Sequence, residues 1–165
     1  MSTITVLGAG SWGTALAIVL AENGHAVMLW GHQPAHMAEL ARSRRNARYL
    51  PDRLLPQTLQ LTADLDEALD FSERLLIVVP SHAFCSQLEA IRRHRAEGWR
   101  IAWATKGLEL KTGAPLHAVV ADTFGAEMPT AVLSGPTFAR EVAAGQPTAL
   151  TIASAHPEFA AEWVA

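Results

Sequence analysis

Short apolar segments alternate with amphipathic segments along nearly the whole chain, and this alternation constrains the fold more than any other feature. Apolar segments of strand length cover residues 3–8, 25–31, 58–62, 74–80, 99–107 with its exit loop, 130–136 and 148–154. Helical spacing covers residues 11–24, 35–42, 64–71, 82–94, 114–125 and 137–145, and a further helix begins at Pro157. Strands that alternate with helices form βαβ units, which build parallel sheets. The sequence therefore predicts an α/β fold with a doubly wound, mostly parallel sheet and helices on both faces.

Residues with known end preferences mark several helix boundaries. Gly24 follows the first helix in the position where a left-handed conformation commonly ends a helix, and Pro34 suits a first helical turn. Thr137 is the predicted N-cap of the helix in residues 137–145. Residues 43–57 contain two prolines and several arginines without clear periodicity, so this stretch is predicted to be irregular.

The size and charge of the chain exclude several classes of protein. Its 165 residues suit one domain spanning 1–165, and 50% hydrophobic with 18% charged residues is a globular composition. Sixteen acidic and 13 basic residues give a net charge of −3, which does not favour nucleic-acid binding. The apolar segments are too short or too interrupted to predict a membrane span.

Cysteine and histidine usage predicts neither disulfides nor a metal site. Cys85 is the single cysteine, so no intrachain disulfide can form, and the N-terminus lacks the basic region of a signal peptide. The expected location is therefore the cytoplasm. The sequence contains no Cys or His spacing of the kind that holds zinc.

Three glycines follow the first predicted strand, where it turns into the first helix. Gly8, Gly10 and Gly13 form the pattern G-x-G-x-x-G. In a Rossmann-type fold the first glycine permits the tight turn, the second leaves room for a pyrophosphate, and the third lets the helix pack near the strand. Free N–H groups at the helix start receive the phosphates. We therefore predict a dinucleotide site here, the alternative being a tight turn without a ligand.

The second predicted strand ends without the acidic residue that often binds the adenosine ribose, about 20 residues into this motif. No Asp or Glu lies between Asn23 and Ala38, so both NADP and NAD are admissible cofactors. His32 lies at the tip of this strand and is the preferred candidate for a contact at the adenosine end. The basic residues Arg42, Arg44 and Arg45 are a second source of positive charge, although an ordinary solvated surface explains them better.

Polar residues follow two later strands, at the sheet edge where ligands of open α/β folds bind. Lys106 comes directly after the fifth strand, where it can pair with a phosphate or an anionic substrate; the alternative is a solvated loop lysine. Gly135, Pro136 and Thr137 follow the sixth strand and form a second glycine turn before a helix. This turn is a second candidate anion site.

Five segments together resemble one enzyme family in their order and spacing. They are GAGSWGTALA (8–17), LWGH (29–32), VVPSH (78–82), WATKGLE (103–109) and SGPTFAREVAAGQPTA (134–149). With these segments the chain resembles the nucleotide-binding half of the bacterial NAD(P)-dependent glycerol-3-phosphate dehydrogenases. The resemblance covers essentially all 165 residues.

The resemblance implies an oxidoreductase that interconverts dihydroxyacetone phosphate and sn-glycerol 3-phosphate with NADPH or NADH, for phospholipid synthesis. By position it implies cofactor contacts at Ser11, Trp12 and Ala139, besides His32 near the adenosine. It implies that Lys106 contacts both cofactor and substrate. It also implies substrate contacts at Gly135 and Thr137.

The family's catalytic lysine and an arginine pair belong to a C-terminal helical domain, and the chain ends at Ala165 before it. The resemblance therefore implies that residues 1–165 carry no catalytic residue, that the partner of this domain is the chain's own helical domain, and that the substrate is a small phosphorylated molecule. It leaves open whether the protein is a homodimer.

Two other functions remain open from the residues. One is a dinucleotide sensor without catalysis, and the other is the cofactor domain of a different two-domain reductase, acting on hydroxyacids or ketopantoate. Lys106 and SGPTFARE (134–141) favour an enzyme over a sensor, because a sensor has no use for a second anion site. ATKGLE (104–109) and the longer SGPTFAREVAAG (134–145) argue against the other reductases.

Overall fold

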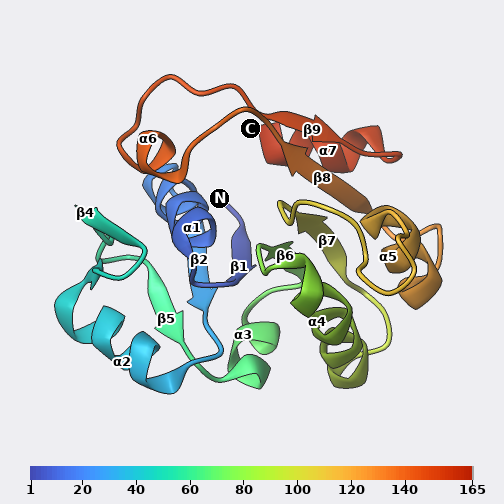
Figure 1. Ribbon diagram of the computed structural model, residues 1–165, viewed down its shortest axis with the longest axis horizontal. Coiled ribbons are helices and arrows are strands. Elements are labelled where there is room, and N and C mark those ends of the chain that lie inside the picture. The colour runs from blue at the N-terminus through green and yellow to red at the C-terminus, as the bar shows by residue number, and fades with distance from the viewer. Residues whose placement is uncertain (165) are drawn as a thin grey trace.

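A computed structural model describes residues 1–164 and contains one seven-stranded sheet (Figure 1). Its strands, in chain order, are β1 (Thr3–Leu7), β2 (Ala26–Trp30), β5 (Gln60–Thr62), β6 (Arg74–Ile77), β7 (Arg100–Trp103), β8 (Thr130–Ser134) and β9 (Thr151–Ala153). Their order across the sheet is β5-β2-β1-β6-β7-β8-β9. Every neighbouring pair is parallel except β8 and β9, which are antiparallel.

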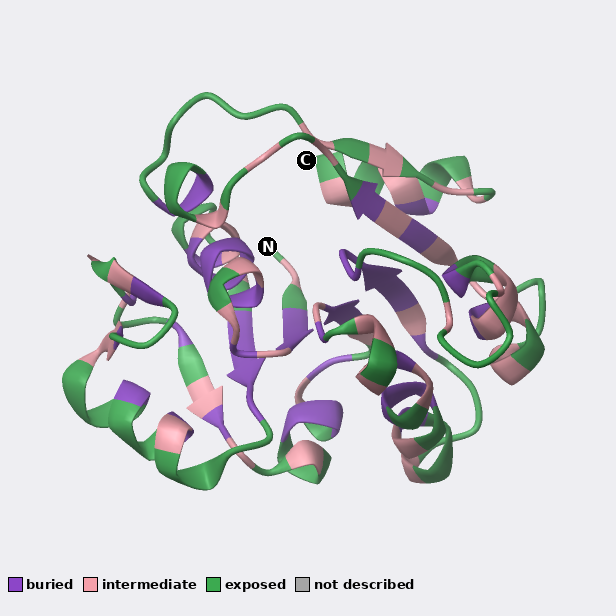
Figure 2. Ribbon diagram, in the orientation of Figure 1, coloured by how far each residue is buried: buried purple, intermediate pink, exposed green. Residues whose placement is uncertain are grey.

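Helices connect the strands and cover both faces of this sheet. They are α1 (Ser11–Glu22), α2 (Pro34–Ser43), α3 (Leu65–Phe71), α4 (Ser81–His94), α5 (Leu116–Phe124), α6 (Ala139–Ala143) and α7 (Pro157–Val164). Alternate residues of each central strand point to opposite faces. On β1, Val6 packs in the core beneath α1, whereas Leu7 packs in the core beneath α3, α4 and α5. Figure 2 shows the central strands and the inner sides of the helices as buried.

The chain reverses its direction across the sheet next to β1. It runs from β1 outward to β2 and β5, returns to β6 on the other side of β1, and continues to β7 and β8. In an open α/β sheet this switch point creates a crevice at the carboxyl ends of the strands. The predicted doubly wound, mostly parallel α/β fold with helices on both faces is confirmed.

The prediction that residues 43–57 are irregular is wrong, because this stretch forms a two-stranded antiparallel hairpin. Its strands are β3 (Arg45–Asn46) and β4 (Leu50–Leu54). Pro51 lies in β4, which pairs with β3 alone. Each strand of a two-stranded ladder has one unpaired edge, so a residue without an N–H group is tolerated there. The guanidinium groups of Arg44 and Arg45 donate to carbonyl oxygens of Pro56 and Pro51. These side-chain bonds stabilise a hairpin that has no alternating apolar pattern.

The prediction that Thr137 is an N-cap is also wrong. Helix α6 begins at Ala139, its N-cap is Phe138, and no side chain caps it. Phe138 is extended, with φ −106° and ψ 137°, which moves the helix start past Thr137. The hydroxyl oxygen of Thr137 is buried without a hydrogen-bond partner within residues 1–164.

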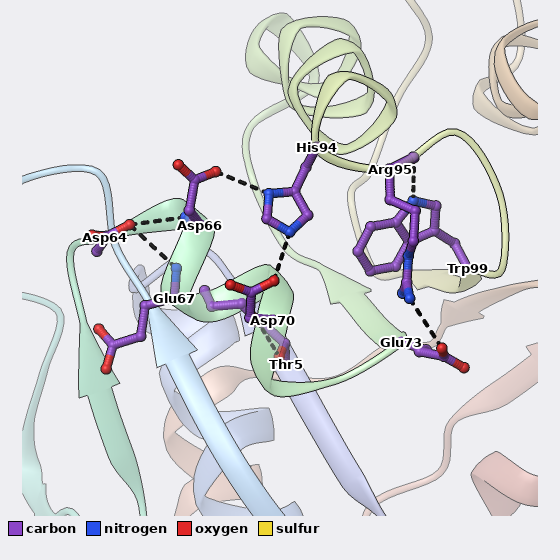
Figure 3. A network of polar contacts seen from close by, with 10 residues as sticks. Thr5, Asp64, Asp66, Glu67, Asp70, Glu73, His94, Arg95 and Trp99 are labelled. Carbon is purple, nitrogen blue, oxygen red and sulfur yellow. Dashed lines mark hydrogen bonds and ion pairs between the residues drawn. The ribbon is translucent and has the colours of Figure 1, made fainter.

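The amino ends of the strands carry a network of paired polar groups (Figure 3). The imidazole of His94, at the end of α4, lies between the carboxylates of Asp66 and Asp70 on α3, at 3.0 and 2.9 Å. Figure 3 shows these contacts bridging the two helices. Nearby, the guanidinium carbon of Arg95 lies 4.2 Å from the ring centroid of Trp99, and Arg95 pairs with Glu73. This end of the sheet is thus held together by contacts within the protein.

Candidate functional site

A cleft of about 560 Å³ lies at the carboxyl ends of the strands, over the switch point. It is lined by the residues that follow four parallel strands and by the start of α6. The lining residues include Gly8–Gly13 after β1, Gly31–Gln33 after β2, Val78–Pro80 after β6, Ala104–Lys106 after β7, and Thr137–Ala139 at the start of α6. Parallel strands bring their carboxyl ends to one edge of the sheet, so five segments distant in the sequence meet here.

Two glycines of the first turn are required by the protein's own packing. Gly8 has φ +126°, and a Cβ there would lie 2.5 Å from the carbonyl oxygen of Val78 on the neighbouring chain segment. A Cβ on Gly13 would lie 1.9 Å from the carbonyl oxygen of Gly8. Real Cβ atoms do not approach backbone atoms this closely. Gly8 therefore permits the turn and Gly13 permits the close contact of α1 with it, as the motif predicts.

Gly10 is different, because none of the described residues fills the space beside it. Apart from Gly10 and its chain neighbours, no atom of residues 1–164 lies within 4 Å of the position a Cβ would take, and its φ of −77° is open to any residue. Gly10 also lines the cleft. The fold itself thus gives no reason for a glycine at this position, whereas a ligand that approaches the backbone here would supply one.

The start of α1 offers unpaired donors to that space. Within residues 1–164, the backbone N–H groups of Gly10, Ser11 and Trp12 donate no hydrogen bond, and no side chain caps the helix. The first turn of α1 carries no acidic residue. The positive end of a 12-residue helix dipole therefore faces the cleft with free donors, which is the arrangement that binds phosphate groups.

The end of β2 forms the wall where the adenosine was predicted. His32 lines the cleft and is exposed, beside Gln33. The described lining includes no carboxylate, which agrees with the absence of an acidic residue from this part of the sequence. The guanidinium groups of Arg44 and Arg45 donate to the carbonyl oxygens of Pro56 and Pro51, and neither arginine lines the cleft.

Arg48 is a cation near the cleft that no pattern in the sequence predicts. Its Nη1 donates to Gln33 Oε1 at 3.4 Å, and its guanidinium carbon lies 5.0 Å from the centroid of the Tyr49 ring. Gln33 and Tyr49 both line the cleft. Because hairpin β3–β4 was not predicted, nothing in the sequence indicated that Arg48 would lie beside the end of β2.

The end of β7 places Lys106 at the opposite part of the cleft. The buried Thr105 hydroxyl donates to the carbonyl oxygen of Val79 at 2.8 Å, which ties the end of β7 to the end of β6. Lys106 follows this fixed residue and is exposed. It lines both the main cleft and an adjoining hollow of about 450 Å³. Its ammonium group is therefore free to meet an anion at the junction of the two.

The structure brings Thr137 and Ala139 into the cleft but not Gly135. A Cβ on Gly135 would lie 2.7 Å from the carbonyl oxygen of Ala149, so this glycine is explained by packing against the returning chain. Gly135 does not line the cleft. With five residues, α6 is also too short to act as an anion-binding helix. A direct substrate contact by Gly135 stays a prediction.

Other parts of the molecule are less suited to a site. A larger hollow of about 740 Å³ lies at the amino ends of the strands, but its charged side chains are already paired: Arg74 and Arg100 with Glu162, Arg95 with Glu73, and His94 with Asp66 and Asp70. Desolvation by burial, together with the nearby carboxylates of Glu109 and Glu89, raises the pKa of the half-buried Cys85 thiol, so it is a poor nucleophile.

The residues that the structure describes contain neither a membrane-spanning helix nor a cluster of metal-binding side chains. No helix among residues 1–164 is both long enough and apolar enough to cross a membrane. The same residues contain no group of three or more His, Cys, Asp or Glu side chains placed to hold a metal ion.

A glycine turn at the switch point of a doubly wound sheet, leading into free helix N–H groups, defines a dinucleotide-binding domain of the Rossmann type. Comparison with known proteins narrows this class. A family model for the N-terminus of NAD-dependent glycerol-3-phosphate dehydrogenase matches residues 3–160, and the chain belongs to this family. The predicted family is therefore confirmed, and so is a nicotinamide dinucleotide as its cofactor.

Individual relatives agree with this assignment. The chain is 55% identical over 157 residues to a glycerol-3-phosphate dehydrogenase (NAD(P)+) of Aeromonas hydrophila, covering 95% of this chain and 47% of the relative. It is 51% identical over 160 residues to the enzyme of that name from Haemophilus influenzae, covering 97% and 48%. The crystal structure of glycerol-3-phosphate dehydrogenase from Coxiella burnetii superposes with a TM-score of 0.93 at 44% identity, covering 98% of this chain and 49% of that one. The chain thus spans about half the length of the relatives it matches.

Proposed function

We propose that residues 1–165 are the NAD(P)-binding domain of a glycerol-3-phosphate dehydrogenase. The observation that carries this proposal is the contrast within the glycine turn. At Gly8 and Gly13 the protein's own backbone occupies the space that a Cβ would need. The space beside Gly10 is open among the described residues and lies at the unpaired N–H groups of α1. A pyrophosphate accepts hydrogen bonds from such groups and needs that space.

The proposed reaction interconverts dihydroxyacetone phosphate and sn-glycerol 3-phosphate, which supplies a backbone for phospholipids. When bound at this cleft, a reduced nicotinamide would supply the hydride, and the carbonyl oxygen of the substrate would need a proton from an acid. Lys106 lines the cleft and is exposed, and its ammonium group suits a phosphate or a polarised carbonyl oxygen. Thr137 lines the cleft, and its buried hydroxyl has no hydrogen-bond partner within residues 1–164, which makes this residue the second candidate for a substrate contact.

The acid is proposed to lie outside residues 1–165. No carboxylic acid lines the described cleft, and its histidines, His32 and His36, come from the β2 end, away from Lys106. We propose that a helical domain of the same protein supplies the acid and covers the open side of the cleft, because hydride transfer needs a pocket that excludes water. We also propose a cytoplasmic location, and the homodimer stays a further possibility for experiment.

We expect the 165-residue chain to bind NADPH without turning it over. The measurement is oxidation of NADPH in the presence of dihydroxyacetone phosphate, followed at 340 nm, with binding measured separately by quenching of tryptophan fluorescence. A control reaction contains the Aeromonas hydrophila relative, which is about twice as long. Sustained turnover by the 165-residue chain would show that the acid lies within it. Turnover of other 2-oxo substrates by a longer protein carrying this domain would favour a different reductase.

We expect NADPH to bind at least as tightly as NADH, because the end of β2 has no carboxylate to repel a 2′-phosphate and Arg48 lies beside it. His32→Asp should therefore weaken NADPH more than NADH, by about tenfold in the ratio of dissociation constants. The matched control is His32→Asn, which removes the imidazole without adding charge and should leave the ratio within about threefold of the unaltered chain. Tighter binding of NADH by the unaltered chain would contradict this expectation.

A further inference from the structure

The side chain of Asn46 links hairpin β3–β4 to the glycine turn and is completely buried, with an exposed fraction of 0%. Its Nδ2 donates to the carbonyl oxygen of Ala9 at 3.1 Å and to Thr14 Oγ1 at 2.8 Å. Its Oδ1 lies 3.1 Å from His36 Nε2 and accepts from the Tyr49 N–H at 3.3 Å. Both donors and both acceptor positions of the amide are thus used.

The orientation of this amide is fixed by its partners. The Ala9 carbonyl can only accept and the Tyr49 N–H can only donate, so Nδ2 must face Ala9 and Oδ1 must face Tyr49. It follows that the nitrogen of His36 facing Oδ1 carries a proton. A buried amide with four satisfied hydrogen bonds is a rigid anchor, because any rotation leaves a buried polar group without a partner.

The bond to Ala9 determines the direction of the next N–H group. A trans peptide unit is planar, and its C=O and N–H groups point in opposite directions. The Ala9 carbonyl points inward to the buried Asn46, so the Gly10 N–H of the same peptide unit points away from Asn46. Gly10 lines the cleft, and its N–H makes no hydrogen bond within residues 1–164.

We infer that Asn46 is a positioning residue for the cofactor: by holding the Ala9 carbonyl it aims the Gly10 N–H at the pyrophosphate. This inference rests on the proposed NADPH binding at the glycine turn. The beginning of the turn is fixed separately, since the Gly8 N–H donates to the Trp30 carbonyl at 2.9 Å. The peptide between Ala9 and Gly10 is thus the part of the turn that depends on the hairpin.

Two matched variants separate this role from simple structural support. Asn46→Asp keeps the shape and the acceptor for His36 and Tyr49, but it places a carboxylate oxygen against the Ala9 carbonyl. Thr14→Val removes the other acceptor of the same amide and leaves the bond to Ala9 in place. We expect Asn46→Asp to weaken NADPH binding about tenfold or more, and Thr14→Val to change it by less than about threefold.

A second ligand shows whether the loss arises at the pyrophosphate. Adenosine 2′-monophosphate lacks a pyrophosphate and should bind Asn46→Asp within about twofold of the unaltered chain, whereas general damage to the domain would weaken both ligands. Equal NADPH affinity in folded Asn46→Asp and in the unaltered chain would overturn the inference and leave the proposed function standing. If the unaltered chain does not bind NADPH, the proposed function fails and the inference fails with it.

Amide hydrogen exchange in the unaltered chain tests the same inference if Asn46→Asp does not fold. The Gly10 N–H should exchange rapidly in the free protein, because it has no acceptor, and saturating NADPH should slow its exchange by about tenfold or more. Slow exchange of the Gly10 N–H in the free protein would overturn the inference. So would bound NADPH that leaves this exchange rate unchanged.

Discussion

Replacing Gly10 by valine is expected to abolish NADPH binding while the domain stays folded. The new side chain would fill the open space beside the free N–H groups of α1, so a pyrophosphate could no longer reach them. Apart from the neighbouring residues in the chain, nothing in residues 1–164 lies within 4 Å of the new Cβ, and valine can adopt the φ of −77° found at this position. We expect the dissociation constant for NADPH to rise by at least about 100-fold, and the free energy of unfolding to change by no more than about 1 kcal/mol.

The measurement is a pair of titrations on each protein, one with NADPH and one with urea. Gly10→Ala adds a single carbon atom to the same space and should give an intermediate loss of affinity, which makes it a graded control. A valine variant that unfolds at the same urea concentration as the unaltered chain and binds NADPH within about threefold of it would exclude a pyrophosphate at this turn.

Replacing Gly13 by alanine is expected to destabilise the domain strongly, unlike the change at Gly10. The added carbon would lie 1.9 Å from the Gly8 carbonyl oxygen, so α1 must move away from the end of β1. Both segments belong to one buried core, and a forced displacement of this kind costs roughly 3 kcal/mol or more in the free energy of unfolding.

Urea unfolding of Gly13→Ala and Gly10→Ala provides the comparison. Both variants add the same methyl group to the same motif. Helix propensity favours alanine at Gly13, inside α1, and not at the N-cap Gly10, so a lower stability of the Gly13 variant reports on local packing. The Gly10 variant should unfold within about 1 kcal/mol of the unaltered chain. Equal stability of the two variants would show that Gly13 is not packed against the turn as the structure has it.

The sequence was sufficient to predict the parallel sheet and the position of the cleft, because strand and helix periodicities are local signals. Gly24 illustrates this: it has φ +87° just after α1, as its place in the sequence predicts. The roles of Gly8, Gly10 and Gly13 could also be predicted, because the motif gives each glycine a separate steric reason. These features depend on residues close together in the chain.

The sequence was not sufficient to predict the hairpin of β3 and β4 or the role of Asn46. The hairpin is stabilised by arginine side chains that donate to carbonyls, and Asn46 reaches Ala9 across 37 positions of the sequence. No periodicity reports such contacts. Gly135 is a further case: its packing against Ala149 accounts for a glycine at this position and was not visible in the sequence, while its contact with the substrate stays a prediction.

The most direct test of the proposed cofactor site is a titration of the 15N-labelled chain with NADPH, followed by the backbone amide signals. We expect saturable shifts of Gly10, Ser11 and Trp12 together with His32, and no shifts around His94 at the opposite end of the sheet. Saturable binding that leaves the signals of Gly10–Trp12 in place would contradict it, as would shifts confined to the residues around His94.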